Sequence, residues 1–305
     1  MPIPSRPFGL RNSELLLIFY FFFLAAIAPF FRDRPSADFR LLWLAIEVAG
    51  MLVLLAWAET RWQRTAYSVA RDWVPLGLAF AAYRTLDLFS PAHYTYRYEL
   101  SWISWDKVVL GNWGIRHIIE AIPLLPGYLE LCYLLTSSAA AIGLAIIYIE
   151  HRRERAESFV FAYLLGLLLA YMIIPWYPSQ PPRVTFPTIE APTATGALRS
   201  LNLAILGRTG IHSGVFPSAH VSSVFAAAFG MFLALPERKA AGWAFLVYAF
   251  SVALATVYGR YHFAADAVAG IVVSLPVGCL LLLTRRAQAT SGTTRRTSPE
   301  SESIR

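Results

Sequence analysis

The stretch HFAADAVAGIVVSLPVGCLLLLT, residues 262–284, joins a polar start to a long apolar run. The run is near the ~20 residues that a helix needs to cross a bilayer. Seven further apolar segments precede it, at about 14–31, 39–58, 72–89, 128–150, 158–176, 216–235 and 240–258. No segment alternates with the two-residue period of a membrane strand, so the sequence predicts an all-α, polytopic membrane helix bundle of about eight transmembrane helices.

Composition supports this fold class. Hydrophobic residues make up 57% of the chain, charged residues 15%, and the mean hydropathy is +0.51. These values exclude an ordinary soluble domain. Cys132 and Cys279 lie inside apolar segments without Cys/His spacing, which argues against a disulfide framework or a structural zinc site. The net charge of +7 does not indicate nucleic-acid binding, because membrane proteins gather Lys and Arg in cytoplasmic loops. We expect a bilayer as partner, and no metal or other cofactor.

The chain divides into three predicted parts. Residues 1–95 hold N-terminal transmembrane helices, residues 96–286 form a catalytic membrane core, and residues 287–305 form a polar tail that we expect to be disordered. The first apolar segment contains Ala26-Ile27-Ala28, which resembles a signal-peptide cleavage site. The apolar run continues past Pro29, however, so an uncleaved anchor is favoured.

Charge distribution predicts the orientation. With the N-terminus inside, Lys and Arg are more numerous on the cytoplasmic side, although the short outer loop Arg32-Asp33-Arg34 argues the other way. The polar starts of segments 216–235 and 262–284 then both face outward. So do two long loops. Residues 90–127 are Trp-rich and read as an interface-lying segment, and residues 177–215 read as a binding loop.

Two polar clusters mark the starts of these segments. One is Pro217-Ser218-Ala219-His220, and the other runs from Arg260 through His262 to Asp266. Polar groups are costly in hydrocarbon, so such clusters are functional-site candidates. Two histidines, a carboxylate and two arginines, Arg183 and Arg260, are what metal-free phosphoryl transfer needs. One His attacks phosphorus, the other protonates the leaving oxygen, and the guanidinium groups hold phosphate oxygens.

Spacing assigns roles within the clusters. His262 and Asp266 are four residues apart, so on a helix the carboxylate accepts the imidazole Nδ1–H and leaves Nε2 free to attack. Ala267 and Gly270 then permit close helix approach. Ser218 is a favoured helix cap, and backbone N–H groups at that helix start point toward an anion. We therefore expect His220 to be the general acid and Ser218 to help seat the phosphate.

The PSxH…HxxxD pattern of His220, His262 and Asp266 resembles the type 2 phosphatidic acid phosphatase (PAP2) superfamily. The stretch Gln180-Pro181-Pro182-Arg183 is similar to the Pro-Pro-Arg form of its inositolphosphotransferase branch, which contains inositol phosphorylceramide synthases. The resemblance covers about residues 177–275. The chain departs from the superfamily pattern at three positions, each of which holds a residue other than the expected one: Trp176 for Lys, Val184 for Pro, and Thr256 for the Arg of the third motif. Arg260 is the residue that would stand in for that arginine.

The resemblance implies an enzyme of the cell (inner) membrane with its active site on the extracytoplasmic face. It implies that a lipid phosphate ester phosphorylates His262, after which water gives a phosphatase and inositol or another polyol gives a phosphotransferase. Two other classes remain open from the residues alone. His220 and His262 are also haem-ligand types, and an Arg/His cluster also suits a lipid carrier without chemistry.

Three polar positions are left without a single assignment. The segment Asp106–Gly111 resembles an inositolphosphotransferase segment, and either acceptor binding or helix–loop packing fits it. Glu47 lies in the middle of the second apolar segment, where a carboxylate is costly unless it is protonated or paired. Arg84, in the third segment, is the partner that we predict for it.

Overall fold

The computed structural model describes residues 9–31, 39–193 and 196–296, with side chains as far as Thr284. These residues are helical without a β-strand, which confirms the all-α prediction. The principal helices are α1 (Asn12–Ile27), α2 (Arg40–Trp62), α3 (Thr65–Thr85), α6 (Leu125–Leu134), α7 (Ala139–Ile149), α8 (Ala156–Ile173), α11 (Ala219–Ala234), α12 (Lys239–Tyr258) and α13 (Ala264–Arg296). Shorter helices are α4 (Glu99–Asp106), α5 (Ile115–Ala121), α9 (Pro182–Thr185) and α10 (Ala197–Thr209).

Helix α11 lies at the centre of the core, packed against α8, α12 and α13. Small residues allow the close approach. A Cβ on Gly166 would lie 2.4 Å from the Ala226 Cβ, and a Cβ on Gly270 would lie 2.5 Å from the Ser218 carbonyl oxygen. The Ser222 hydroxyl also donates to the Gly166 carbonyl at 2.7 Å. Close backbone packing of this kind replaces the hydrophobic driving force that is absent between helices in lipid, and it confirms the role expected for Gly270.

The three N-terminal helices form a unit that packs on α8 through α1 and α3. An ionic cluster fixes one end of this unit. The Arg71 guanidinium pairs with buried Glu14 at 2.6 Å, and Asp72 pairs with Arg11 at 2.6 Å and with Arg153 at 2.8 Å. Removing one member of a buried ion pair leaves its partner uncompensated, at a cost of ~3–5 kcal/mol. The cluster therefore holds α1 and α3 to the core.

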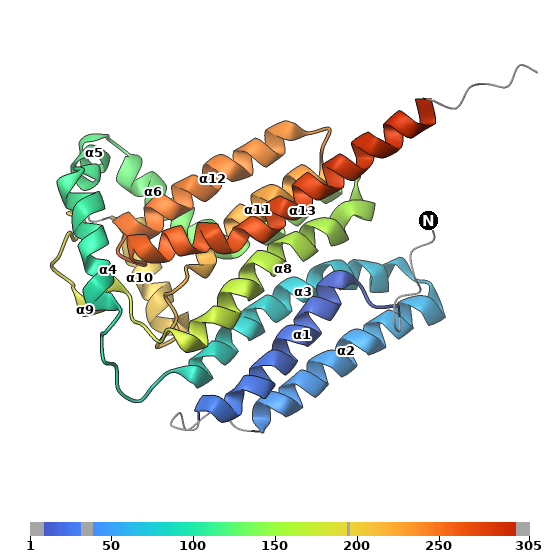
Figure 1. Ribbon diagram of the computed structural model, residues 1–305, viewed down its shortest axis with the longest axis horizontal. Coiled ribbons are helices and arrows are strands. Elements are labelled where there is room, and N and C mark those ends of the chain that lie inside the picture. Colours follow the sequence, from blue (N-terminus) through green and yellow to red (C-terminus); the bar gives the residue numbers. More distant parts are fainter. Residues whose placement is uncertain (1–8, 32–38, 194–195, 297–305) are drawn as a thin grey trace, which may run out of the picture.

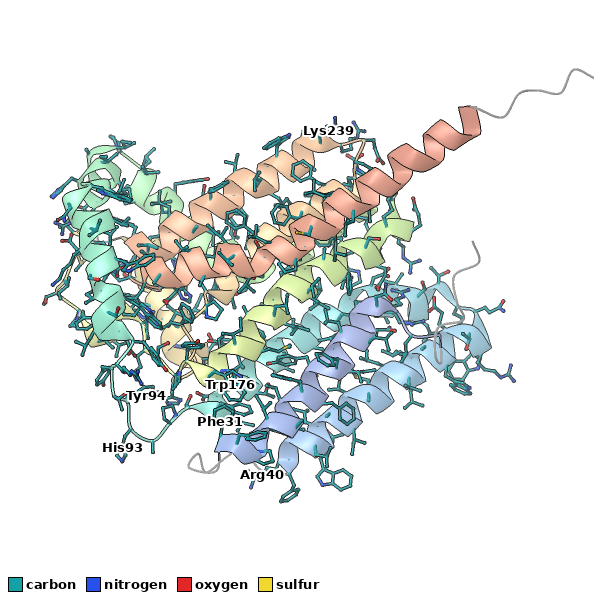
Figure 2. The ribbon with its side chains drawn as sticks, in the orientation of Figure 1. Phe31, Arg40, His93, Tyr94, Trp176 and Lys239 are labelled. Atoms are coloured by element: carbon teal, nitrogen blue, oxygen red, sulfur yellow. The ribbon has the colours of Figure 1, made fainter. Side chains whose placement is uncertain are left out.

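The two ends of the bundle carry different structural elements. Helices α4, α5, α9 and α10 gather at one end, whereas the start of α1 and the last turns of α13 lie at the other (Figure 1). At the first end, the Phe31 ring lies 5.0 Å from the Trp176 ring, which joins the end of α1 to the end of α8 (Figure 2). Lys239 lies toward the opposite end. The predicted long outer loops therefore share one end of the molecule.

Among the described residues, six helical stretches are long and apolar enough to cross a membrane: Asn12–Phe31, Arg40–Trp62, Leu125–Ile149, Arg153–Trp176, Lys239–Tyr258 and Ala264–Thr284. The protein is thus a multi-pass membrane protein. The two other predicted segments coincide with α3, which carries Arg71, Asp72 and Arg84, and with the 16-residue apolar helix α11. The count of eight spans stays a prediction.

Two expectations are corrected by the structure. Arg84 donates to the Thr209 carbonyl at 2.9 Å rather than to Glu47, which lies on the exposed face of α2. Because α2 turns that face away from the bundle, the two side chains cannot meet. The predicted tail begins as helix, since α13 continues to Arg296. Extending an existing helix is much easier than starting one. Residues 297–305, residues 1–8 and the loop Arg32-Asp33-Arg34 lie outside the described residues.

Candidate active site

The stretch before α11 adopts the predicted cap. The Ser218 hydroxyl accepts the Val221 N–H at 3.4 Å, and the Ser218 N–H donates to the Asp266 carbonyl at 3.0 Å. This second bond ties the start of α11 directly to the first turn of α13. The Ser218 side chain is fully buried. Its hydroxyl is therefore occupied as a helix cap, and its expected contact with phosphate stays a prediction.

A tight turn between α12 and α13 presents His262. The Thr256 carbonyl accepts both the Tyr261 N–H at 2.9 Å and the His262 N–H at 3.0 Å. Arg260 has φ of 62°, in the left-handed region that residues other than Gly rarely adopt. Asp266 closes the turn, because its Oδ2 accepts the Phe263 N–H at 2.8 Å. The position where the superfamily pattern has an arginine, Thr256, thus supports the turn through its backbone.

The two histidines meet as the sequence predicted. His262 Nε2 lies 3.4 Å from His220 Nδ1. His262 Nδ1 lies 2.9 Å from the Val215 carbonyl oxygen and 3.5 Å from Asp266 Oδ2. A carbonyl only accepts, so His262 Nδ1 carries the proton, and the lone pair of the unprotonated Nε2 accepts the hydrogen bond from His220 Nδ1. The orienting partner is therefore chiefly Val215 rather than Asp266, whose Oδ2 already accepts the Phe263 N–H.

Electrostatics keep His262 neutral. Burial, the neighbouring His220 and the Arg183 guanidinium hold the pKa of His262 well below its ordinary value. The hydrogen bond to Val215 opposes this shift without reversing it. A neutral imidazole with an unprotonated Nε2 is a nucleophile, whereas imidazolium is not.

Arg183 reaches the histidines from the 177–215 loop. Its backbone N–H donates to the Arg260 carbonyl at 3.2 Å, and its Nη1 lies 3.5 Å from the Tyr261 carbonyl oxygen. The guanidinium also lies over the Tyr261 ring, 5.6 Å from its centroid. Among the described residues, Arg183 forms no ion pair with a carboxylate. Its positive charge is therefore available to an anion.

Arg260 is placed differently. Its Nη1 forms an ion pair with Asp106, whose other oxygen accepts the Ala264 N–H at 2.7 Å. Arg260 is only 2% exposed, and its Nε and Nη2 have no hydrogen-bond partner among the described residues. Gly111 leaves room for Glu190, since a Cβ there would lie 2.6 Å from Glu190 Oε1. The contacts of the Asp106–Gly111 segment are thus those of helix–loop packing.

Sequence reasoning missed a polar network beside the histidines. Glu130 on α6 accepts the Tyr261 hydroxyl at 2.6 Å, Arg199 Nη1 at 2.9 Å and Asn202 Nδ2 at 2.7 Å. The Tyr261 ring stacks on Tyr133 with centroids 3.7 Å apart, and Tyr133 lies 5.3 Å from the His220 ring. A carboxylate within the predicted segment 128–150 was the signal that pointed here.

A cavity of about 290 Å³ opens beside the histidines. Both His220 and His262 line it, together with aromatic, aliphatic and hydroxyl side chains from α3, α8, α10 and the α6–α7 region. Arg183 and Arg260 do not line it. Among the described residues, no group of three or more His, Cys, Asp or Glu side chains has an arrangement that suits a metal ion.

Comparison with protein families gives one match. The model of the PAP2 superfamily matches residues 102–280, which is more than half of the chain and contains Arg183, His220, His262 and Asp266. Searches of curated proteins and of solved structures returned no match. The matched range contains the paired histidines and the residues that orient them, and the chain therefore belongs to the PAP2 superfamily.

Proposed function

We propose that the protein is an integral-membrane phosphatase or phosphotransferase that acts on lipid phosphate esters through a phosphohistidine at His262. The observation that carries this proposal is the His262–His220 pair at the end of the cavity, with the unprotonated Nε2 of His262 facing His220. Membership of the PAP2 superfamily supports activity on phosphate esters. The apolar helices support a lipid substrate.

The first step forms a bond from His262 Nε2 to phosphorus and breaks the bond from phosphorus to the ester oxygen. The bonding electron pair leaves with that oxygen, and His220 supplies the proton that neutralises it. The two nitrogens are now within hydrogen-bonding range, so no phosphate fits between them. Substrate binding must therefore separate the two rings, which places the nucleophile and the acid on opposite sides of phosphorus.

The second step reverses the roles. A hydroxyl oxygen attacks phosphorus, the bond to His262 Nε2 breaks, and His220 accepts the proton of the attacking hydroxyl. Water as the attacking group gives hydrolysis. A polyol such as inositol gives transfer, which the Pro-Pro-Arg form around Arg183 supports. We propose that this chemistry occurs at the extracytoplasmic face of the inner membrane.

Four further residues have supporting roles in this proposal. Arg183, unpaired and close to both histidines, is the proposed principal ligand of the phosphate oxygens. Asp266 shares in orienting His262 while it closes the turn. Ser218 aligns the start of α11, whose N–H groups face the phosphate. Arg260 is neutralised by Asp106, so we propose that it acts mainly by fixing the turn that carries His262.

The test is product identification with purified protein in mixed micelles. Labelled lipid phosphates are incubated in EDTA, with and without inositol, and free phosphate and phosphoinositol products are separated. We expect phosphate release or transfer, together with an acid-labile, alkali-stable phosphoenzyme that is absent in His262→Ala. Absence of both products and of the phosphoenzyme across the lipid panel would contradict the proposal. A spectrum of the same sample tests the haem alternative, which gains no support from two nitrogens in mutual contact, because axial ligands lie on opposite faces of the haem.

A further inference from the structure

One wall of the cavity beside the histidines comes from outside the family region. Helix α3 contributes Leu76, Ala79, Phe80 and Tyr83 to its lining, although the match to the PAP2 superfamily begins at residue 102. The neighbouring helix α8 and the turn after it contribute a second wall, through residues from Tyr163 to Ile174. The N-terminal unit therefore takes part in shaping the space in front of the histidines.

The cavity is deep and narrow. Tyr163 and Ile174 both line it and are eleven residues apart on the α8 side, which at 1.5 Å per residue corresponds to about 16 Å along the helix. This depth is about half of the ~30 Å hydrocarbon core, or one leaflet. A volume of about 290 Å³ lies at the small end of ligand pockets (~300–1,000 Å³). A cavity of this volume and depth is narrow enough to suit a single hydrocarbon chain.

The lining favours hydrocarbon at depth. Leu76, Leu167 and Leu206 face the space between α3, α8 and α10. Phe80 and Ile205 also line the cavity, yet they are 58% and 40% exposed at the surface of the bundle. The cavity thus reaches the side of the bundle, where the surrounding lipid lies. A chain that enters sideways between Phe80 and Ile205 has its charged head beside His220 and His262 at the outer end.

Hydrogen bonds hold α3 in register with the catalytic residues. The Ile211 N–H donates to the Tyr83 hydroxyl at 3.2 Å, and the His212 N–H donates to Asp87 at 2.7 Å. Ile211 and His212 lie four and three positions before Val215, whose carbonyl orients His262. The α3 wall therefore lies at a fixed distance from the nucleophile. A pocket can select chains by length only if its wall lies at a fixed distance from the residues that bind the head group.

We propose that α3 makes this cavity a chain-length gauge: it receives a single hydrocarbon chain of the substrate, and Ala79 and Leu76 set how much of that chain is accommodated. The inference rests on the proposed function for the identity of the head group. It goes beyond that function in assigning chain selection to a helix that is not part of the family region.

The test uses two series of ligands with increasing saturated chain length. Lysophosphatidic acids report turnover, and n-alkyl phosphonates, which cannot be turned over, report binding. Each methylene that enters the cavity is expected to raise phosphonate affinity about fourfold, until the chain fills the cavity and affinity levels off. Ala79→Leu places a larger side chain about 6 Å below Tyr83, by the helical rise of four residues. We expect its plateau at a shorter chain, with the shortest ligands bound as in the original protein.

Gly77→Leu is the matched control. It adds a side chain of the same size on the same helix, where a Cβ meets no atom within 4 Å, and its plateau should not move. Ala79→Leu could instead weaken the binding of short and long ligands alike. In that case Phe80→Ala is the deciding variant, because removing the exposed Phe80 ring at the edge of the cavity should allow branched chains to bind. An unchanged plateau in Ala79→Leu, or no gain of branched chains in Phe80→Ala, overturns the inference. Chain-dependent binding without turnover would instead refute the proposed function and leave the gauge standing.

Discussion

At the scale of single residues, the site depends on the different environments of two histidines. His262 has its Nδ1 fixed by the Val215 carbonyl, so its Nε2 is the unprotonated, nucleophilic atom. His220 opens α11 and faces that atom. Among the described residues, the contact with His262 is the one hydrogen bond of the His220 ring, whereas His262 is also held by Val215. Under the proposed mechanism, this difference makes His262 the nucleophile and His220 the acid.

These assignments predict unequal losses. His262→Ala should abolish the phosphoenzyme with every substrate. His220→Ala should slow release of an alkyl alcohol by about 10²–10⁴-fold, the usual contribution of a general acid. It should largely spare an aryl phosphate, whose leaving oxygen needs no proton. Burst kinetics with the two substrate types measure this difference. Equal losses on both substrates in His220→Ala would refute its role as acid.

The pH dependence should follow His262. Its pKa lies below the ordinary 6.5, so the neutral, nucleophilic form persists as the pH falls through that value. With an aryl phosphate, the acid limb of phosphoenzyme formation should therefore lie below about pH 6.5. The Arg183 charge lowers this pKa, so removing it in Arg183→Gln should move the limb to higher pH. Arg208→Gln, at an exposed position on α10, is the control, and a limb that does not move in Arg183→Gln would contradict the placement of Arg183.

At the scale of elements, helix α4 holds the turn that carries His262. Asp106 at the end of α4 pairs with Arg260 in the turn and also accepts the first N–H of α13. Trp102, on the same helix, stacks on Phe216 just before the Pro-Ser-Ala-His motif, with ring centroids 4.7 Å apart. Helix α4 thus braces both of the motifs that supply histidines.

Because α4 contacts both motifs, we expect removal of Asp106 to lower the stability of the protein strongly, and removal of both charges of the ion pair to restore much of it. Asp106→Ala leaves the buried Arg260 unpaired, which should destabilise the protein by ~3–5 kcal/mol. The double variant Asp106→Ala/Arg260→Met removes both charges, so it should regain much of that stability. Thermal unfolding in detergent, followed by intrinsic fluorescence, measures both variants. If the double variant is no more stable than the single one, the ion pair is not what holds α4 to the turn.

At the scale of the whole molecule, the ionic cluster of the N-terminal helices and the candidate site lie at opposite ends. His220 in the first turn of α11 and His262 just before α13 lie toward the end that carries α4, α5, α9 and α10, and the ionic cluster around Arg71 and Asp72 joins the start of α1 to the start of α3 at the other end (Figure 1). A bundle whose candidate site lies at the loop-rich end has a definite sidedness in a membrane. The predicted orientation puts the site outside.

Accessible cysteines test that orientation. Ser200 on α10 is exposed at the loop-rich end, and Glu154 before α8 is exposed at the opposite end. In a Cys279→Ala background, with Cys132 buried, Ser200→Cys should react with an impermeant thiol reagent in intact cells. Glu154→Cys should react only after permeabilisation, since such reagents do not cross the hydrocarbon core. The reverse pattern would place the site in the cytoplasm.

The sequence alone determined the class of fold and predicted the main residues of the candidate site. Long apolar runs determine helices that cross a bilayer, because backbone groups must be satisfied within each segment. The predicted topology placed His220 at the same end of the bundle as His262, and the i, i+4 spacing of His262 and Asp266 predicted their proximity from local helix geometry. Ser218 as a cap was predictable for the same reason.

Only the tertiary structure decided which partners those groups have. The Val215 carbonyl, Glu130 and Asp106 come from segments far from the residues they contact, and no local pattern encodes such a meeting. The cavity likewise needs α3 and α8 to be packed side by side before its depth exists. The spacing of apolar residues along a segment reports the secondary structure of that segment alone. The partner of a buried charge and the shape of a space between helices depend on packing among segments that are distant in the chain, and therefore appear only in the folded molecule.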